Sequence, residues 1–398
     1  MGERRNPFVR RRILHVAALP FPSSQGTQVY IRQMCENQAG RGHDVHLLTY
    51  HHGMDGYRPE RYLIHRLPDF PRFRSLRSGP SWKKIALDLR MAPAIDGIIR
   101  KIAPHILHAH NYEALAISLM ANMARLPLLY HAHTLLEPEL PCYFKGRMFR
   151  TAAGISGLVA DRFLPALAGA TVTVSPYLRE ALIAHGVKED RVFYLPPSLE
   201  PGEEGAFPGK PLRYGISDFV YIGNLDEYQG IGDLMQGISR LARIRNSVTF
   251  KFISDSDPDE YAALARSLGI SRIVLFERHG DFSTAAARLK ASRIALAPRK
   301  IPGGFPMKLI NYLQARKPVI ASAHGSGGLR HGREAMVYGS TDDFVQCALD
   351  LLTDGNLRSR IARAGYRYAQ EKFPWGRSLA ILDSVYDKML GSPRSSRG

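Results

Sequence analysis

The residues best suited to chemistry lie in the segment 303–315, Gly-Gly-Phe-Pro-Met-Lys-Leu-Ile-Asn-Tyr-Leu-Gln-Ala. Apolar runs flank it at 294–298 and 318–322, which is the pattern of a strand, a glycine loop, a short helix and a strand. Glycines let a backbone approach a ligand closely, and a proline suits the first helical turn. The N–H groups at a helix start favour anions, and Lys308 and Asn311 share one helix face. The segment therefore predicts a nucleotide site, with an ordinary βαβ crossover as the alternative.

Two further segments, 106–111 and 128–134, each contain the sequence His-Ala-His within a strand-like run. Alternation along a strand places the two histidines of each segment on a common face. Polar residues at strand ends of an open α/β sheet face the ligand crevice, where histidine can orient a substrate or handle a proton. Metal binding is the less favoured alternative, because no Asp, Glu or Cys lies at ligand spacing beside these histidines.

Length and charge limit the class of protein. The 398 residues favour about two domains, and 45% hydrophobic with 23% charged residues is typical of a globular chain. A net charge of +18 indicates anionic partners, such as nucleic acid, phosphorylated substrates or an acidic membrane surface. Cys35, Cys142 and Cys347 are too scattered for a disulfide framework or a metal site, so we expect a reducing, cytoplasmic setting.

The amino-terminal segment has some features of a signal peptide, because three arginines precede the apolar run 13–19. That run is short, His15 interrupts it, and the turn sequence 25–27 follows. We therefore predict a first buried strand, with a signal peptide as the minor alternative. No run approaches the roughly 20 apolar residues that a membrane span needs, so any membrane contact is expected at the surface.

Strand-like and helix-like segments alternate in two series, separated by the proline- and glycine-rich segment 199–211. This pattern predicts an α/β fold with two Rossmann-like, doubly wound domains at 1–198 and 212–376, joined by the linker 199–211. The remaining residues 377–398 are expected to form a helix and a tail that can cross back to the first domain. Helices are also predicted over 28–39, ending at Gly40, over 306–316 and over 343–369. The strands are predicted at 13–19, 44–49, 106–111, 128–134, 171–176, 192–197, 218–225, 248–253, 273–276, 294–298 and 318–322.

Residues 58–84 interrupt the alternation with a group of basic and aromatic residues. The group comprises Arg58, Arg61, Arg66, Arg72, Arg74, Arg77, Phe70, Phe73, Lys83 and Lys84. Arginines with aromatic residues suit an anionic membrane surface or a phosphorylated acceptor, and a solvated loop is the alternative. Nucleic acid is an unlikely partner, because no recognised nucleic-acid motif accompanies the charge.

In their order along nearly the whole chain, these pieces resemble the GT-B-fold glycosyltransferases of glycosyltransferase family four, also called group 1. The motifs that carry the resemblance are Gln25-Gly26-Thr27, Arg41-Gly42-His43-Asp44-Val45, Tyr-Ile-Gly-Asn-Leu at 221–225, Gly304-Phe305-Pro306 and Lys317-Pro318-Val319-Ile320-Ala321-Ser322. The resemblance implies two Rossmann-like domains that face each other across a cleft. It also implies retaining transfer of a sugar, a hexose, from a nucleotide-diphosphate sugar, without an essential metal or another cofactor.

The resemblance places the donor site in the second domain. The implied donor-binding residues are Gly223, Asn224, Gln229, Arg299, Gly303, Gly304, Phe305, Lys308 and Asn311. The family usually has two glutamates around this helix, and the matching positions in this chain are Gly303 and Asn311. It also usually has an Arg and a Lys near the glycine turn of the second domain, and the matching positions here are the uncharged Asn224 and Gln229. Lys308 and Arg299 are the nearest cationic substitutes, and Lys308 is expected to act in catalysis by stabilising the leaving diphosphate.

The resemblance places the acceptor in the first domain, where it implies roles for Gly26, Thr27, His110, Glu137 and Glu139. His133 is the expected catalytic residue for acceptor positioning or proton handling, and a structural histidine that caps a strand is the alternative. The expected product is a lipid-linked or surface polysaccharide of the cell envelope, made by a peripheral protein at the cytoplasmic membrane face. Loss of both glutamates leaves a nucleotide-sugar-binding protein or scaffold with little transferase activity as the alternative.

Overall fold

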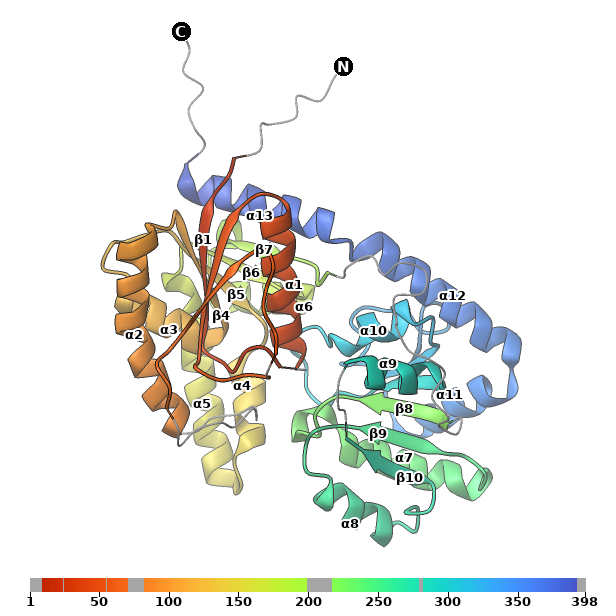
Figure 1. The fold of residues 1–398 in the computed structure, drawn as a ribbon. Helices are drawn as coiled ribbons and strands as arrows, with labels where there is room; N and C mark the ends of the chain where they lie inside the picture. The colour runs from red at the N-terminus through yellow and green to blue at the C-terminus, as the bar shows by residue number, and fades with distance from the viewer. Residues whose placement is uncertain are drawn as a thin grey trace, which may run out of the picture.

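The computed structural model describes residues 9–23, 25–54, 56–70, 82–198, 217–278 and 282–391. In these residues the chain forms two β-sheets, each covered by helices (Figure 1). All strand pairs are parallel, so the predicted α/β fold with two doubly wound Rossmann-like halves is confirmed. The linker predicted at 199–211 lies outside the described residues.

The first sheet has the strand order β3-β2-β1-β4-β5-β6-β7. Its strands are β1 (Arg12–Ala17), β2 (Asp44–Thr49), β3 (Leu63–Arg66), β4 (Ile106–His110), β5 (Leu128–Ala132), β6 (Ala170–Thr173) and β7 (Val192–Tyr194). The direction of the strand order reverses between β1 and β4, where Ala17 lies opposite His110. In open α/β sheets, ligands bind at the carboxyl ends of the strands at such a reversal.

The second sheet repeats this order as β10-β9-β8-β11-β12-β13. Its strands are β8 (Ser217–Ile222), β9 (Phe250–Ile253), β10 (Val274–Glu277), β11 (Ser292–Ala297), β12 (Val319–Ser322) and β13 (Met336–Tyr338). Here the reversal lies between β8 and β11, where Val220 is opposite Ala295. The central strands are apolar on both faces because helices cover both faces of a parallel sheet.

The helices fill the connections between the strands, as right-handed crossovers require. Those of the first half are α1 (Gly26–Gly40), α2 (Trp82–Ile102), α3 (Asn111–Ala121), α4 (Leu136–Glu139), α5 (Arg147–Phe163) and α6 (Pro176–Ala184). Those that follow are α7 (Ile231–Ile244), α8 (Asp259–Ser267), α9 (Phe282–Lys290), α10 (Lys308–Gln314), α11 (Thr341–Thr353), α12 (Gly355–Lys372) and α13 (Trp375–Leu390).

Three predicted helices differ from the observed ones. The helix predicted over 28–39 begins earlier, at Gly26, and ends at Gly40 as predicted. Its C-cap, however, is Arg41 rather than Gly40, and Gly42 follows with a positive φ (104°). The helix predicted over 343–369 is two helices, because the Asp354 side chain accepts from two N–H groups and starts a new helix there.

The predicted nucleotide helix over 306–316 is shorter in the structure. It comprises seven residues, Lys308–Gln314, with Met307 as its N-cap. The N–H of Leu309 instead bonds to the carbonyl oxygen of Pro306 at 2.9 Å, in a tighter turn that precedes the helix. Lys308 and Asn311 lie on neighbouring turns of it and both are half-buried.

Two short edge strands escaped prediction. β3 lies within 58–84, the segment that the sequence pattern left as an interruption, and β13 lies after β12. Both are brief, and Leu63 at the start of β3 is 59% exposed. Edge strands of this length have little hydrophobic periodicity for sequence reasoning to detect.

The last helix, α13, follows α12 and packs against α1 of the first half (Figure 1). Arg11, which is 3% exposed, forms an ion pair with Asp383 at 3.7 Å. His43 Nε2 donates to the same carboxylate at 2.9 Å, and Arg41 lies 3.2 Å from it. Asp383 therefore holds the end of the chain on the start of the first half.

Two expectations from composition can be compared with the structure. Cys35, Cys142 and Cys347 are all free thiols, in agreement with the absence of a disulfide framework. In the described part of the chain, no helix combines the length and the apolar character that crossing a membrane requires.

Candidate active site

The predicted donor-side residues gather at the carboxyl end of the second sheet. Gly223 and Asn224 follow β8 directly, and Arg299 follows β11 after a single proline. These two strands are the neighbours between which the strand order reverses. The structure therefore brings Gly223, Asn224 and Arg299 to the position where a Rossmann-like sheet binds its ligand.

Lys308 links the start of α10 to this position. Its Nζ donates to the Tyr221 hydroxyl at 2.9 Å and to Gln229 Oε1 at 2.8 Å, and it lies 4.0 Å from the centre of the Tyr221 ring. Gln229 in turn donates from Nε2 to Asn224 Oδ1 at 2.8 Å. A Cβ atom on Gly223 would lie 3.0 Å from the ammonium, so glycine there leaves the cation room. Lys308, Gln229 and Asn224 thus form one hydrogen-bonded group, with Gly223 beside it.

The charge of Lys308 is poorly compensated. Burial lowers its pKa well below the ordinary value, and the Arg299 guanidinium lowers it further, whereas Asp226 raises it. Asp226 is itself affected, because burial and then the charge of Glu139 raise its pKa to about 6. The ammonium therefore has neutral oxygens as hydrogen-bond partners and a carboxyl group of weakened acidity nearby.

Gly303 occupies the position of a family carboxylate, and the structure shows what fills the space. A Cβ atom on Gly303 would lie 2.6 Å from Nη2 of Arg299, so the guanidinium occupies the region that a side chain at 303 would enter. Arg299 Nε donates to the carbonyl oxygen of Ile301 at 3.0 Å, and its backbone N–H donates to Ser322 Oγ at 2.8 Å. A cation therefore stands where the family pattern has an anion.

Gly304 brings the two halves of the chain into contact. A Cβ atom there would lie 1.9 Å from the carbonyl oxygen of His133, a distance that no side chain can occupy. Next to it, Ser175 Oγ donates to the carbonyl oxygen of Gly303 at 3.2 Å. The interpretation that these glycines admit a ligand is therefore incomplete, because in this structure they admit the backbone of the first half.

The other predicted residues of the glycine loops have mixed surroundings. Gly26 opens α1, and a Cβ atom on it would lie 3.1 Å from Cβ of Met307, which places the first glycine loop against the donor helix. Thr27 follows in the first turn of α1. The ring of Phe305 is 9% exposed and packs edge-on against Phe373 at 5.3 Å, so it faces the core.

The two His-Ala-His segments lie side by side on β4 and β5 and meet a fifth histidine on β1. His110 Nδ1 lies 3.2 Å from His133 Nε2, and His110 Nε2 lies 2.9 Å from His15 Nδ1. His108 Nε2 lies 3.1 Å from His131 Nδ1. Four of these rings are fully buried, and His133 is half-buried at the contact with the second half. Sequence reasoning found the pairs but not the cluster, which requires the strand order.

The acidic residues predicted on the acceptor side separate. Glu139 accepts from the Thr134 hydroxyl at 2.5 Å and from the Tyr143 hydroxyl at 3.0 Å, next to the contact between the halves. Glu137 points elsewhere, with its carboxylate 3.6 Å from Nε2 of His185. The structure therefore keeps Glu139 near the donor-side group and moves Glu137 away from it.

A group of ionisable residues lies near Glu139, and of these only Lys84 was named from the sequence, as part of the basic group at 58–84. Burial raises the pKa of Glu113 and lowers the pKa of Lys84, and each offsets part of the other's shift. Burial also raises the pKa of Asp88 to about 6. Asp226 completes the group from the second half and directly follows the glycine motif 221–225. That adjacency was a usable signal, whereas the other three come together only through packing.

The predicted basic and aromatic group at 58–84 is only partly a surface. Arg66 donates to the carbonyl oxygen of Phe21 at 2.8 Å, and Lys84 faces the acidic group described above. Phe70 packs against the core beneath Arg90, whose guanidinium lies 5.3 Å from the ring centre. Arg66 is nevertheless exposed, so these contacts leave part of the group at the surface, and its role towards an anionic partner stays a prediction. The positions that lie outside the described residues are Arg72, Phe73, Arg74 and Arg77.

Helix α5 presents an apolar surface that sequence reasoning missed. Its exposed apolar residues recur at helical spacing and are Met148 (74%), Phe149 (59%), Ile155 (59%), Leu158 (38%), Val159 (50%) and Phe163 (59%). The exposed basic residues on and before the helix are Lys145, Arg147, Arg150 and Arg162. We call this surface, residues 145–163, the α5 face. Its signal is a helical apolar period with arginines at the margins.

Comparison of the sequence with models of known protein families shows which family the chain matches. The family described as Glycosyltransferase Family 4 matches residues 24–202, and Glycosyl transferases group 1 matches residues 217–354. The chain belongs to glycosyltransferase family four. It is therefore a transferase enzyme of GT-B fold, and the resemblance drawn from the motifs is confirmed.

Individual relatives are distant but cover the whole chain. The D-inositol 3-phosphate glycosyltransferase of Acidothermus cellulolyticus is 21% identical over 98% of this chain and 93% of its own. A sucrose-phosphate synthase from Thermosynechococcus elongatus superimposes with a TM-score of 0.77 at 16% identity, over 96% of this chain and 99% of its own. The structure of Anabaena HepE in complex with UDP and glucose superimposes with a TM-score of 0.73 at 14% identity, over 95% of this chain and 100% of its own. These structural likenesses show the fold, and the site residues stay predictions.

Proposed function

We propose that this glycosyltransferase moves a hexose from a nucleotide-diphosphate sugar to a lipid-linked or polysaccharide acceptor, with retention of configuration and without an essential metal. The observation that carries the donor part is the Lys308 ammonium, whose hydrogen bonds go to neutral oxygens of Tyr221 and Gln229. A diphosphate at the carboxyl ends of β8 and β11 would supply the missing negative charge. The UDP and glucose found with HepE support UDP-glucose as the first donor to test.

The proposed mechanism rests on charge that builds on the diphosphate as the glycosidic bond loosens. Lys308 and Arg299 are the cations that would stabilise this charge, and their positions are fixed before the reaction by the bonds described above. Gly223 would let the backbone approach the phosphates. On the other side of the contact between the halves, His133 would position the acceptor hydroxyl, within 3.2 Å of His110.

The α5 face supports action at the cytoplasmic face of an anionic membrane, in synthesis of cell-envelope polysaccharide. Exposed Phe149, Ile155 and Phe163 offer apolar side chains, and Arg147 and Arg162 lie at the margins of this stripe. A helix of this kind lies in the headgroup region with its apolar side inward. A lipid-linked acceptor would then reach the first half of the protein, where the acceptor residues are predicted.

The donor is tested by incubating the purified protein with UDP-glucose, UDP-N-acetylglucosamine and GDP-mannose, together with a lipid extract. Transfer is followed by mass spectrometry, and the configuration of the new bond by NMR. We expect transfer from one donor, an α-linked product from an α-linked donor, and full activity after chelator treatment. An inverted product, or activity that only added Mg²⁺ restores, would contradict the proposal.

The membrane part is tested by sedimentation with vesicles of phosphatidylglycerol and phosphatidylcholine, with pure phosphatidylcholine for comparison. We expect binding to the anionic vesicles that falls when Phe149 and Phe163 become Ser. The matched control is Ile244→Ser at the end of α7 in the second half, which is 64% exposed. A separate variant with Arg72, Arg74 and Arg77 changed to Ala measures the contribution of the segment 58–84. Equal sedimentation of all proteins would contradict membrane action through either surface.

A second function has a specific observation in its favour. Because the Arg299 guanidinium fills the region next to Gly303, the sugar contact of the family carboxylate has no side chain to make it. The chain would then bind a nucleotide sugar and act as a scaffold with little transfer. Calorimetry that shows UDP-glucose binding, together with no transfer to any acceptor extract, would favour this function.

A further inference from the structure

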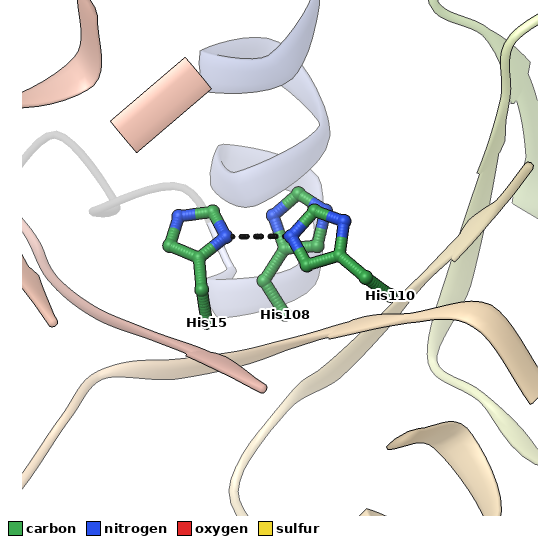
Figure 2. Close-up of side chains that lie close together, drawn as sticks. All are labelled: His15, His108 and His110. Atoms are coloured by element: carbon green, nitrogen blue, oxygen red, sulfur yellow. Dashed lines mark hydrogen bonds between the residues drawn. The ribbon is translucent and has the colours of Figure 1, made fainter. Parts of the chain in front are cut away.

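The histidines of the cluster bring their ring nitrogens within hydrogen-bond distance of one another in three pairs. Two groups of three histidines each bring one ring nitrogen per residue within 4.8 Å of the others: His15, His108 and His110, and His110, His131 and His133. Figure 2 shows the first group, with His15 aimed at the ring of His110 and α13 passing beside them. Three neutral imidazoles at this spacing are a donor set for a transition-metal ion.

The second group has a nitrogen with nothing to bind. His131 is fully buried, and its Nδ1 is engaged with His108 Nε2 at 3.1 Å. Its Nε2 is also buried and has no hydrogen-bond partner in the described part of the chain. Leaving a buried polar atom unpaired costs roughly 1–3 kcal/mol, so such an atom requires an explanation. In the first group, by contrast, His15 and His110 bond to each other.

The hydrogen-bond chain fixes the state of His110. Gln38 donates from Nε2 to the Tyr386 hydroxyl at 3.0 Å, so its Oε1, 2.7 Å from His15 Nε2, accepts. His15 therefore carries its proton on Nε2 and accepts at Nδ1, and His110 donates to it from Nε2. The Nδ1 atom of His110 thus keeps its lone pair, and this atom faces His133.

Because His110 Nδ1 accepts, its contact with His133 Nε2 is a hydrogen bond donated by His133, and an ion between the two nitrogens would require His133 to carry its proton on Nδ1 instead. The spacing of the two nitrogens fits one ion. Two nitrogens bound to tetrahedral zinc at about 2.0–2.1 Å lie roughly 3.3 Å apart. His110 Nδ1 and His133 Nε2 are 3.2 Å apart, and one nitrogen of His131 lies within 4.8 Å of both. We propose that His110, His131 and His133 bind a single late first-row divalent metal ion, with Zn²⁺ as the physiological candidate, and leave its fourth position for water or a ligand oxygen.

The surroundings favour this ion over harder cations. Imidazole nitrogens suit Zn²⁺, Ni²⁺ and Cu²⁺, whereas Mg²⁺ and Ca²⁺ need oxygen ligands, which this group does not offer. Burial lowers the pKa of His133 to about 3, and burial and neighbouring histidines lower those of His110 and His131, so the rings are neutral near pH 7. His15 and His108 bond to the second nitrogens of two ligands, as partners of metal-binding histidines do.

The position of the group suggests an entry route and a consequence. His133 is half-buried at the contact between the halves, whereas the other two rings are enclosed. An ion reaching the group from that side would engage His133 and keep it from any role towards the acceptor. The inference does not depend on the proposed transfer, since the ion is bound on the acceptor side and the donor group is held by Lys308 and Arg299.

The test is a titration of chelator-treated full-length protein with Zn²⁺ by calorimetry and with Co²⁺ by visible absorption. We expect one ion per chain and the intense visible bands of tetrahedral Co²⁺. In His133→Gln we expect affinity about 100-fold weaker, because a ligand is lost at a half-buried position. Circular dichroism of that variant checks its fold, and Zn²⁺ should raise the Tm of the parent protein by more than that of His133→Gln.

A matched control exists on the edge of the same sheet. His46 Nδ1 and His65 Nε2 lie 2.9 Å apart, a pair with the spacing of the proposed ligands. His65→Gln should leave the Zn²⁺ affinity and the Co²⁺ spectrum of the parent unchanged. Absence of Co²⁺ bands in the parent, equal Zn²⁺ affinity in His133→Gln, or loss of binding in His65→Gln would each overturn the proposed site.

Discussion

Replacing Lys308 by Met separates a donor-binding cation from a structural one. Methionine keeps the length and packing of the side chain but removes the ammonium. In the protein without donor, the change removes a buried charge, which is favourable, and leaves Gln229 Oε1 without its donor at 2.8 Å, which costs roughly 1–3 kcal/mol. These effects oppose each other, so we expect the free energy of unfolding to change by no more than about 1 kcal/mol.

Donor affinity should respond much more strongly. A hydrogen bond between a charged group and a phosphate contributes roughly 1.5–3 kcal/mol, which is about 10- to 150-fold in Kd. Calorimetry with UDP and with UDP-glucose measures this loss, and urea unfolding measures the stability of the same samples. Transfer should fall at least as far as affinity, because the charge on the diphosphate is larger in the transition state.

The control is Lys372→Met, which removes an exposed lysine at the end of α12. It carries the same change in net charge and should bind UDP like the parent, so long-range electrostatics are controlled for. Two results would refute the reasoning about Lys308. The first is UDP affinity within twofold of the parent in Lys308→Met. The second is a loss of more than about 3 kcal/mol in stability with unchanged affinity, which would identify a structural cation.

Three further predictions address the contact between the halves, the pH dependence and the last helix. Gly304→Ala forces a Cβ atom into the carbonyl oxygen 1.9 Å away, so transfer should fall about 100-fold, whereas Gly97→Ala, which meets nothing within 4 Å, should retain activity. Asp226 has a pKa raised to about 6, so the folded state holds a proton that the unfolded state has lost. Urea unfolding of the parent should therefore show stability falling as pH rises from about 4 to 6. Asp226→Asn should reduce this fall, to which Asp88 with its pKa of about 6 also contributes, and should gain about 1–2 kcal/mol at pH 7. An identical pH profile in the variant would contradict the assignment. Asp383→Ala removes one ion-pair partner of Arg11, whose side chain is 4% exposed. The free energy of unfolding should therefore fall by about 2–3 kcal/mol, as measured by thermal unfolding. An unchanged Tm would mean that the ion pair does not stabilise the folded protein.

The fold could be predicted from local pattern because most strands of these parallel sheets are short, predominantly apolar runs. Segments such as 44–49 and 192–194 are recognisable without knowledge of their neighbours. The missed strands β3 and β13 are edge strands of three or four residues, where burial imposes little pattern. The donor residues Gly223 and Lys308 were accessible for a similar reason, since a glycine turn and a helix start leave local signatures.

Other features depend on contacts between distant parts of the chain, which no local pattern contains. The sequence determined that His108 and His110 share a strand face, but only the order β1-β4-β5 brings His15 and His131 against them. The same holds for the contact of Gly304 with the first half, which arises when the two halves pack together, and for the surroundings of Lys308, which come from the packing of α10 against the end of β8. Sequence thus determined which residues could do chemistry, while tertiary packing decided their partners, their charge and the space around them, because these depend on distance and solvent exclusion.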